Sequence, residues 1–290
     1  MEQNILEKIR NGEIQAHEAE EGIVSDTYIA ENFVVQASAG FDDKIRINRF
    51  MIDKLGENGV PVPEVIDYSE DPLFVAFNRL EGLSLDNRDT FTEEQYLEAV
   101  RNAGEALALV HQQEGLGYGN PDPEHGFEQG VFDDWRSFID SDIQGTLDYV
   151  DSDRFRPVVE KADELLDIDE LPESPDSRIL HMDYTPDNVF VADDLSVTVL
   201  DFDGAIYGDP DFDLMYAELI MSKYGDQTLG NFIDGYTGLR DAELRPELER
   251  NYTALAVLRD ARGGEWCLQN DRDVDLDEWA RGLENTVEGL

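Results

Sequence analysis

Cysteine and lysine are scarce in this chain of 290 residues, and long apolar runs are missing from it. Its one cysteine, Cys267, cannot form a disulfide within the chain, which fits a reducing compartment. The longest apolar stretches, such as 106–110 and 197–200, are far shorter than the ~20 residues of a membrane-spanning helix. The first residues show no positive segment followed by an apolar one, so no signal peptide is readable. We therefore expect a cytoplasmic protein outside the membrane.

Positive charge is also in short supply. The chain has 67 Asp and Glu residues against 22 Lys and Arg residues, which gives a formal net charge of −45. Nucleic-acid binding through counterion release needs a basic patch, and the sequence contains none, so we do not expect nucleic acid as a partner.

The kind of imbalance is informative as well. Only 5 of the basic residues are lysines. A low lysine content together with many Asp and Glu residues resembles the composition of cytosolic proteins from salt-adapted organisms. At molar salt the Debye length is ~3 Å, so surface carboxylates hardly repel one another. An acidic surface for a polycationic partner is the alternative interpretation.

The chain is long enough for two lobes, and we expect a boundary near residue 80. Residues 1–80 have the short β-prone runs and single amphipathic segment of a small antiparallel sheet with one main helix. The helices expected there cover 3–11 and 42–56, and the strands cover 22–24, 27–30, 33–36, 64–68 and 73–77.

Residues 81–290 predict a mostly helical lobe, so the expected fold class is α+β. A loop is expected at 114–130, and extended structure only at 179–180 and in a hairpin within 189–200. The expected helices cover 92–112, 132–150, 154–168, 211–223, 227–236, 242–262 and 275–288.

The predicted hairpin carries candidate metal ligands. A two-residue turn at Asp194 and Leu195 would place Asn188 directly opposite Asp201, with Cβ atoms ~5 Å apart; a turn one residue longer would keep them neighbours. Two oxygen ligands at this separation suit a Mg²⁺ ion that also binds waters and phosphate oxygens. Asp183 lies five positions before Asn188, close enough to serve the same site as a base.

The set Asp183, Asn188 and Asp201 has the spacing of the protein-kinase catalytic apparatus. The segment HMDYTPDN (181–188) stands at the catalytic loop, DFD (201–203) stands where such kinases have DFG, and GDPDFDL (208–214) follows. This block resembles the aminoglycoside phosphotransferase and choline kinase-like family of small-molecule kinases. A weaker resemblance runs from about residue 20 to 265. It implies a protein-kinase-like two-lobe fold, with residues 1–80 binding nucleotide and residues 81–290 carrying the catalytic loop and the acceptor pocket.

The resemblance also implies roles for the residues of the block. Asp183 is expected to accept the proton of the acceptor hydroxyl, and Asn188 and Asp201 to hold Mg²⁺ on the phosphates of ATP or GTP. Asp203 replaces the glycine of DFG and is a candidate second metal ligand or substrate contact, with a solvated acid as the alternative. His181 is expected to brace the loop.

A second group of residues is expected to be structural. Asp213 is expected to cap the helix that begins near Leu214, and Asp209 to fix the loop before that helix.

The N-terminal lobe departs from the pattern of the family. Its phosphate loop, 21–26, has one glycine, and the strand position that usually carries Lys holds Gln36. The helix position of the partner Glu falls near Asn48, so we expect a neutral Gln36–Asn48 pair in place of an ion pair, with Lys44 as the nearby lysine. The residues expected to contact nucleotide are Gly22, Ser25, Gln36 and the hinge residues Phe77, Asn78, Arg79 and Leu80.

The acceptor is expected to be a small hydroxylated metabolite, namely an amino sugar, a sugar, an amino alcohol or an aminoglycoside-like compound. Candidates for its pocket in the helical lobe are Tyr184, Tyr207, Arg262 and Trp266, with Trp135 beside them. Core packing is the alternative role for each.

Two other functions fit parts of the sequence. A nucleotide-binding regulator without turnover would explain the missing ion pair. A haloacid dehalogenase-like phosphatase would use Asp201 as its nucleophile and Asp203 as its acid, but it leaves HMDYTPDN unexplained. We expect an ATP- and Mg²⁺-dependent phosphotransferase.

Overall fold

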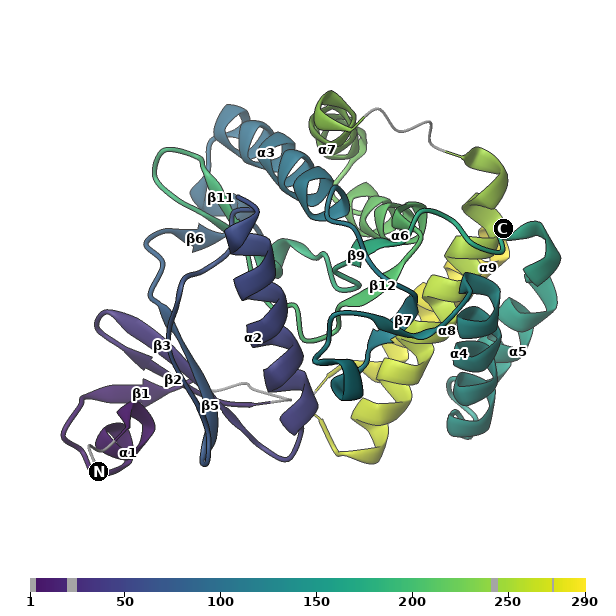
Figure 1. Ribbon diagram of the computed structural model, residues 1–290. Coiled ribbons are helices and arrows are strands. Elements are labelled where there is room, and N and C mark those ends of the chain that lie inside the picture. The colour runs from purple at the N-terminus through teal and green to yellow at the C-terminus, as the bar shows by residue number, and fades with distance from the viewer. Residues whose placement is uncertain (1–3, 20–24, 241–244, 273) are drawn as a thin grey trace.

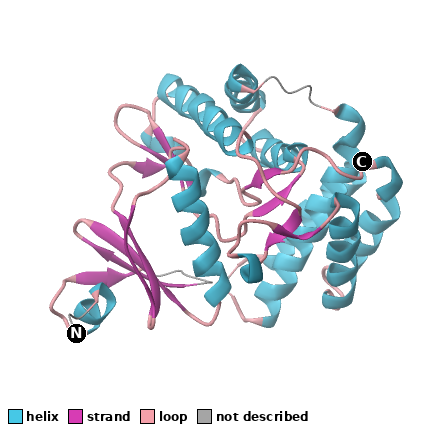
Figure 2. Ribbon diagram, viewed as in Figure 1, coloured by secondary structure: helices cyan, strands magenta, loops and turns pink. Residues whose placement is uncertain are grey.

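The computed structural model describes residues 4–19, 25–240, 245–272 and 274–290, which form two lobes (Figure 1). The N-terminal lobe is a five-stranded antiparallel sheet in the order β1-β2-β3-β5-β4 (Figure 2). Its strands are β1 (Ala16–Glu18), β2 (Ser25–Ala30), β3 (Phe33–Ser38), β4 (Val65–Glu70) and β5 (Leu73–Asn78). Its helices are α1 (Ile5–Arg10) and α2 (Asp42–Glu57).

The two helices and β2 to β5 confirm the predictions for this lobe, with a two-residue turn joining β2 to β3, whereas β1 was not predicted. The predicted strand over 22–24 lies outside the described residues. Successive side chains of a strand point to opposite faces of the sheet. Val35 and Ala37 of β3 therefore pack with Leu6 of α1, whereas Gln36 faces α2, which lies between the sheet and the helical lobe (Figure 1).

The C-terminal lobe is mostly helical, so the α+β prediction is confirmed. Its helices are α3 (Glu93–His111), α4 (Trp135–Tyr149), α5 (Arg156–Leu165), α6 (Pro210–Ser222), α7 (Asp226–Leu239), α8 (Glu249–Gln269) and α9 (Leu276–Gly289). A capping box opens α3, because Thr92 and Gln95 each accept a hydrogen bond from the other's backbone N–H.

Helix α8 begins later and ends later than predicted. Pro246 lies in the 3₁₀ turn Pro246–Leu248, and the helix starts after that turn. The helix continues through Gly264 to Gln269, and the ring of Phe155 packs so closely on Gly264 that a Cβ there would overlap it.

Two small sheets lie inside the helical lobe, in the orders β11-β10-β6 and β8-β7-β12-β9. Their strands are β6 (Leu83–Ser84), β7 (Tyr118–Pro121), β8 (Gly130–Phe132), β9 (Arg178–Leu180), β10 (Val189–Val191), β11 (Val197–Val199) and β12 (Ile206–Gly208). The 3₁₀ helices are Arg88–Thr90, Pro123–His125, Ile168–Glu170, Pro186–Asn188 and Pro246–Leu248. The predicted loop over 114–130 is therefore wrong in part, because strands of two to four residues are too short to show an alternating pattern.

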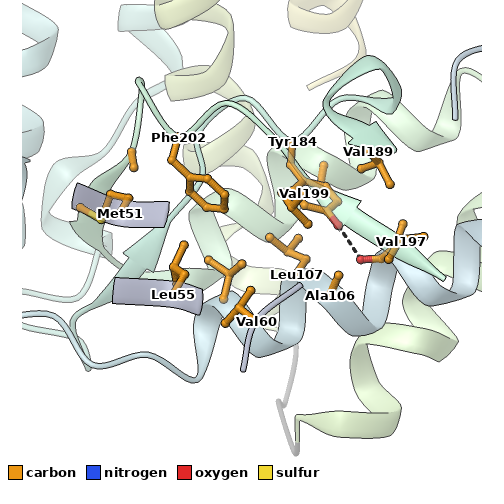
Figure 3. Close-up of a cluster of buried hydrophobic side chains, with 14 of the residues drawn as sticks. Met51, Leu55, Val60, Ala106, Leu107, Tyr184, Val189, Val197, Val199 and Phe202 are labelled. Carbon is orange, nitrogen blue, oxygen red and sulfur yellow. Dashed lines mark hydrogen bonds between the residues drawn. The ribbon is translucent and has the colours of Figure 1, made fainter. Parts of the chain in front are cut away.

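One hydrophobic core connects the two lobes beneath the hairpin β10–β11. Figure 3 shows Met51 and Leu55 of α2, Leu107 of α3, Val199 of β11 and Phe202 packed together. The loops that carry the candidate site are thus supported by elements from both lobes. No helix within the described ranges is long and apolar enough to cross a bilayer.

Candidate active site

The catalytic loop begins where β9 ends, and a buried carboxylate holds its first two residues. Asp213 of α6 accepts hydrogen bonds from the backbone N–H groups of His181 (2.6 Å) and Met182 (2.9 Å). It also receives one from Nε2 of His111 (3.0 Å). Met182 has a positive φ of 66°, a conformation that a non-glycine residue adopts only when its surroundings fix it. Asp213 therefore sets the backbone of the loop.

The expected capping role of Asp213 is wrong. Asp209 is the N-cap of α6, and its carboxylate accepts from the backbone N–H of Asp211 (3.1 Å). Asp213 lies in the first turn of the helix and points to the catalytic loop. Burial raises the pKa of Asp213, but the hydrogen bond and charge of His111 outweigh that effect and hold the pKa below its usual value.

His181 connects the loop to the end of β11. Its Nδ1 accepts from the backbone N–H of Asp183 (3.2 Å), and its Nε2 donates to the carbonyl of Leu200 (2.7 Å). The ring is fully buried and lies 4.6 Å from the ring of Phe202. This position is that of a bracing residue, with both ring nitrogens occupied.

Asp183 and Asn188 contact each other directly. Nδ2 of Asn188 donates to the carbonyl oxygen and to Oδ2 of Asp183, both at 2.9 Å. Because an amide has its donors on nitrogen and its acceptor on oxygen, Oδ1 of Asn188 is left to bind a cation. Asn188 thus holds one carboxylate oxygen of Asp183, whose side chain is exposed.

The register of the hairpin is shifted by one residue from the register that a two-residue turn would give. Val189 pairs with Val199, and the backbone N–H of Ala192 donates to the carbonyl of Ser196 (2.9 Å), so the turn enclosed by this last pair has three residues, 193–195. Leu195 adopts a φ of 67°, and Asp194 accepts from the backbone N–H of Ser196 (3.0 Å), which stabilises this longer turn. Asn188 therefore faces Leu200 and accepts its N–H at 2.9 Å. Asp201 follows at the next position, so the two candidate ligands are neighbours and not directly opposite.

Carboxylates dominate the electrostatics here. The surrounding protein desolvates the carboxylate of Asp183, and the charges of Asp201 and Asp187 add to this, so its pKa rises to about 7. Burial and the charge of Asp203 raise the pKa of Asp201 to about 6, while Lys44 acts in the opposite direction. Mutual repulsion of this kind favours the binding of a cation.

The donor set fits a hard divalent ion. Carboxylate and amide oxygens are ligands that Mg²⁺ accepts, and the ion usually keeps waters or phosphate oxygens as further ligands. Among the described residues, no group of three or more His, Cys, Asp or Glu side chains is arranged to hold a metal. A metal held by Asn188 and Asp201 would therefore need ligands from a bound phosphate or from water.

The expected neutral pair in the N-terminal lobe is confirmed. Nδ2 of Asn48 donates to Oε1 of Gln36 (2.9 Å), and Oδ1 of Asn48 accepts from the backbone N–H of Phe202 (2.9 Å). One helical turn earlier, Nζ of Lys44 donates to the carbonyl of Asp203 (3.0 Å) and lies 3.5 Å from its carboxylate. Lys44 and Asn48 are four residues apart, so they share one face of α2, and this face contacts 202–203.

The other described residues that are expected to contact nucleotide lie on β2, on β5 and directly after β5. Gly22 lies outside the described residues, and Ser25 is the first residue of β2. The hinge side chains stabilise the sheet: Phe77 is buried, Asn78 accepts from the N–H of Glu64 (2.6 Å), and Arg79 donates to the carbonyl of Ala30 (3.1 Å). Leu80 follows β5, which ends at Asn78.

Two of the expected pocket residues belong to the core. Tyr184 is fully buried and donates to the carbonyl of Ala103 at 2.6 Å (Figure 3). Tyr207 is also fully buried and donates to the carbonyl of Phe127 (2.8 Å). Trp135 is buried as well. The alternative of core packing is therefore the correct one for these residues, because each ring fills space between elements that only the tertiary structure brings together.

Arg262 and Trp266 lie on α8, outside the core interior. Arg262 is exposed and pairs with Asp142 at 3.5 Å. Trp266 is partly exposed, and its ring meets that of Phe41 edge to face, with centroids 6.3 Å apart. Since Phe41 precedes α2, Trp266 lies where the two lobes meet.

Two further polar residues, Tyr216 and Asp260, were missed. The hydroxyl of Tyr216 on α6 donates to Asp260 on α8 (2.7 Å). Burial raises the pKa of Tyr216 most, and the charges of Asp260 and Asp183 add to it. Both side chains are partly exposed. No sequence signal identifies them, because they lie 44 positions apart on separate helices.

Comparisons with known proteins agree with this arrangement. A family model described as "Phosphotransferase enzyme family" matches residues 25–250. Hygromycin-B 4-O-kinase of Escherichia coli is 25% identical over 175 residues, 58% of this chain and 50% of the relative. The chain thus spans about half the length of the curated relative it matches.

Solved structures resemble the whole chain. Aminoglycoside phosphotransferase APH(4)-Ia superposes with a TM-score of 0.69 at 19% identity, over 98% of this chain and 97% of that one. A ternary complex of its thermostable mutant with AMP-PNP and hygromycin B gives 0.67 at 19%, over 94% and 93%. A choline/ethanolamine kinase family protein from Mesorhizobium loti gives 0.64 at 17%, over 95% and 87%. The expected protein-kinase-like two-lobe fold is confirmed, and neither the phosphatase nor the regulator without turnover gains support.

Proposed function

The chain belongs to the phosphotransferase enzyme family, and we propose that it transfers the γ-phosphate of ATP or GTP to a hydroxyl of a small metabolite, with Mg²⁺ as the metal. The observation that carries the proposal is the Asp183–Asn188 hydrogen bond at 2.9 Å, next to Asp201 at the end of the same hairpin. Residues 1–80 would bind the nucleotide, and residues 81–290 would provide the catalytic loop and acceptor pocket.

Asp183 is the proposed general base. A base works best when its pKa lies near the working pH, and desolvation with neighbouring charges raises the pKa of Asp183 to about 7. Asn188 holds Oδ2, so Oδ1 is free to accept the proton of the acceptor hydroxyl. Phosphoryl transfer depends mainly on placing the reactants in line, and the fixed loop from His181 to Asn188 provides that placement.

Asn188 and Asp201 are the proposed holders of the metal. A bound Mg²⁺ supplies charge neutralisation on the phosphate oxygens. Asp201 adopts a φ of 59°, which the hydrogen bond from Phe202 to Asn48 helps to maintain one residue later. Ser25, Gln36, Phe77, Asn78, Arg79 and Leu80 remain the proposed nucleotide contacts, with Gln36 offering its amide N–H groups and the hinge its backbone.

The proposed acceptor pocket lies between α6 and α8. Asp260 and Tyr216 offer a carboxylate and a hydroxyl, the charge of Asp183 acts on the pKa of Tyr216, and Arg262 and Trp266 lie farther along α8. A carboxylate suits an amino group, so an amino sugar, amino alcohol or aminoglycoside-like compound is favoured over a neutral sugar. Similar structures contain hygromycin B and gentamicin.

A screen for ADP release tests the proposal. Purified protein with Mg-ATP in high-salt buffer would be offered amino sugars, neutral sugars, amino alcohols and aminoglycosides, and the phosphorylated product identified by mass spectrometry. We expect turnover with at least one amine-bearing acceptor. Tight Mg-ATP binding without ADP release from any acceptor would favour a regulator instead.

We also propose that the protein works in the cytoplasm of a salt-adapted cell. The support is the formal net charge of −45 together with only 5 lysines. The charge is spread along the chain, so by itself it does not identify a cationic acceptor.

A further inference from the structure

Helix α2 contacts the DFD segment at two successive residues. Oδ1 of Asn48 accepts from the backbone N–H of Phe202 (2.9 Å), and Nζ of Lys44 donates to the carbonyl of Asp203 (3.0 Å). Because Lys44 and Asn48 are four residues apart, they share one face of the helix. This face of α2, which lies between the sheet and the helical lobe (Figure 1), therefore fixes the segment that begins with Asp201.

The strand side of the same site brings no positive charge. Gln36 occupies the position on β3 where kinases of this fold carry a lysine, and its Oε1 is already used by Asn48. What β3 presents to a nucleotide is a neutral amide. Asp183, Asp201 and Asp203 add negative charge, and a nucleoside triphosphate adds more, so the site needs a cation besides the metal.

Lys44 is such a cation, and it comes from a different element. Its ammonium lies 3.0 Å from the carbonyl oxygen and 3.5 Å from the carboxylate of Asp203, two residues after Asp201. The side chain is 42% exposed, so the ammonium is reachable by a ligand. An ammonium has three N–H donors, and Asp203 occupies at most two of them.

We propose that Lys44 is the phosphate-binding cation of this protein, supplied by α2 in place of the missing strand lysine. Asp203 is then a positioning residue, whose carbonyl and carboxylate keep the ammonium beside the metal loop, while Asn48 fixes the adjacent peptide without charge. The inference rests on the proposed function, since it assigns a partner to the phosphates of the nucleotide.

The test compares two ligands that differ in their phosphates. Dissociation constants of Mg-AMP-PNP and of adenosine would be measured by isothermal titration calorimetry in high-salt buffer. Lys44→Met should weaken Mg-AMP-PNP about tenfold or more and leave adenosine within about twofold, because a charge-assisted hydrogen bond is lost only for the phosphates. Lys44→Arg keeps the charge and should retain most of the affinity.

Lys54→Met is the matched control. Lys54 lies on the same helix, but its ammonium pairs with Glu128 at 3.2 Å, so its removal changes the net charge equally and should leave both dissociation constants unchanged. A second arm moves the cation back to the strand: Gln36→Lys with Asn48→Glu in the Lys44→Met background should restore the affinity for Mg-AMP-PNP, provided that the melting temperature matches that of the wild type.

Two results would overturn the inference alone. One is wild-type affinity of Lys44→Met for Mg-AMP-PNP, and the other is an equal loss of AMP-PNP and adenosine, which would indicate a purely structural role. If the wild-type protein bound no Mg-AMP-PNP, the proposed function would fail and the inference with it.

Discussion

Asp213 shows how a single buried acid can organise a site without touching a substrate. It accepts three hydrogen bonds, two of them from the catalytic-loop backbone at His181 and Met182 and one from His111. Nδ1 of His111 in turn forms a hydrogen bond with the hydroxyl of Tyr236 (2.8 Å). At the residue scale, the exposed Asp183 depends on this buried group, because the loop that presents it would otherwise be free to relax.

Replacing Asp183 by Asn tests the proposed base. The substitution keeps the shape of the side chain but removes its capacity to accept a proton, so the rate of phosphoryl transfer should fall by about 10²–10⁴-fold. The melting temperature should not fall, because Asn keeps the shape of the side chain and removes a negative charge that desolvation disfavours. Rates of ADP release with a saturating acceptor provide the measurement, and near-normal turnover would contradict the assignment.

Glu218 on α6 makes folding depend on pH. Burial is the main cause that raises the pKa of its carboxyl to about 7, and the charges of Glu249 and Asp211 add to it. Within the described residues its Oε1 is buried without a hydrogen-bond partner. The folded chain therefore binds this proton more tightly than the unfolded chain, so the unfolding free energy should decrease as pH rises from about 4.5 to 7.

Glu218→Gln removes this titration. The variant should be more stable than the wild type at pH 8, and the difference should shrink towards pH 5. Urea unfolding at both pH values in constant salt measures it, and a variant with the same stability difference at both would show that Glu218 is not the group responsible.

At the scale of elements, the helical lobe depends on two helices that meet at glycines. A Cβ on Gly104 of α3 would overlap the carbonyl of Phe232 in α7, and one on Gly235 of α7 would overlap that of Arg101 in α3. These glycines allow α3 and α7 to approach through their backbones. Helix α3 also contributes Leu107 to the core under the hairpin, so the contact supports the catalytic loop.

Gly104→Ala should push α7 away from α3. We expect a loss of about 1–3 kcal/mol in unfolding free energy, as for other overpacked contacts. Gly230→Ala is the control on α7, because Gly230 is exposed and a Cβ there meets open space; it should be neutral or stabilising by up to about 1 kcal/mol. Equal effects of the two substitutions on chemical denaturation would contradict the close contact.

At the scale of the whole molecule, charge sets the conditions for folding. A formal net charge of −45 in 290 residues produces strong self-repulsion in dilute buffer. At molar salt the screening length falls to about 3 Å, compared with about 10 Å at 0.1 M. The same carboxylates then repel one another only over very short distances.

Dialysis from molar KCl to below 0.1 M should unfold or inactivate the protein. Circular dichroism during a salt titration gives the midpoint, and restoring KCl should restore the signal. Sucrose in place of KCl serves as the control, because it does not screen charge. Unchanged melting temperatures below 0.1 M salt would exclude the salt-adapted interpretation and leave the polycationic partner as the explanation of the acidic surface.

Several features of the site could be predicted because they depend on neighbours along the chain. The approach of Asn188 to Asp201 follows from hairpin geometry, although the turn is one residue longer than the two-residue form. The Gln36–Asn48 pair followed from matching one strand and one helix to a known family. Asp213 was assigned wrongly, since a helix start predicts a cap and does not reveal that the helix abuts a loop 30 residues earlier.

The sequence by itself determined the family, the α+β fold of the lobes, the acidic residues of the catalytic block and the neutral residue at the strand position. Periodicity, turn residues and spacing encode these features locally. Only the tertiary structure decided which groups meet. It buried Tyr184 and Tyr207, brought Tyr216 to Asp260, and placed Lys44 on Asp203, because contacts between elements 40 or more residues apart depend on how whole helices pack.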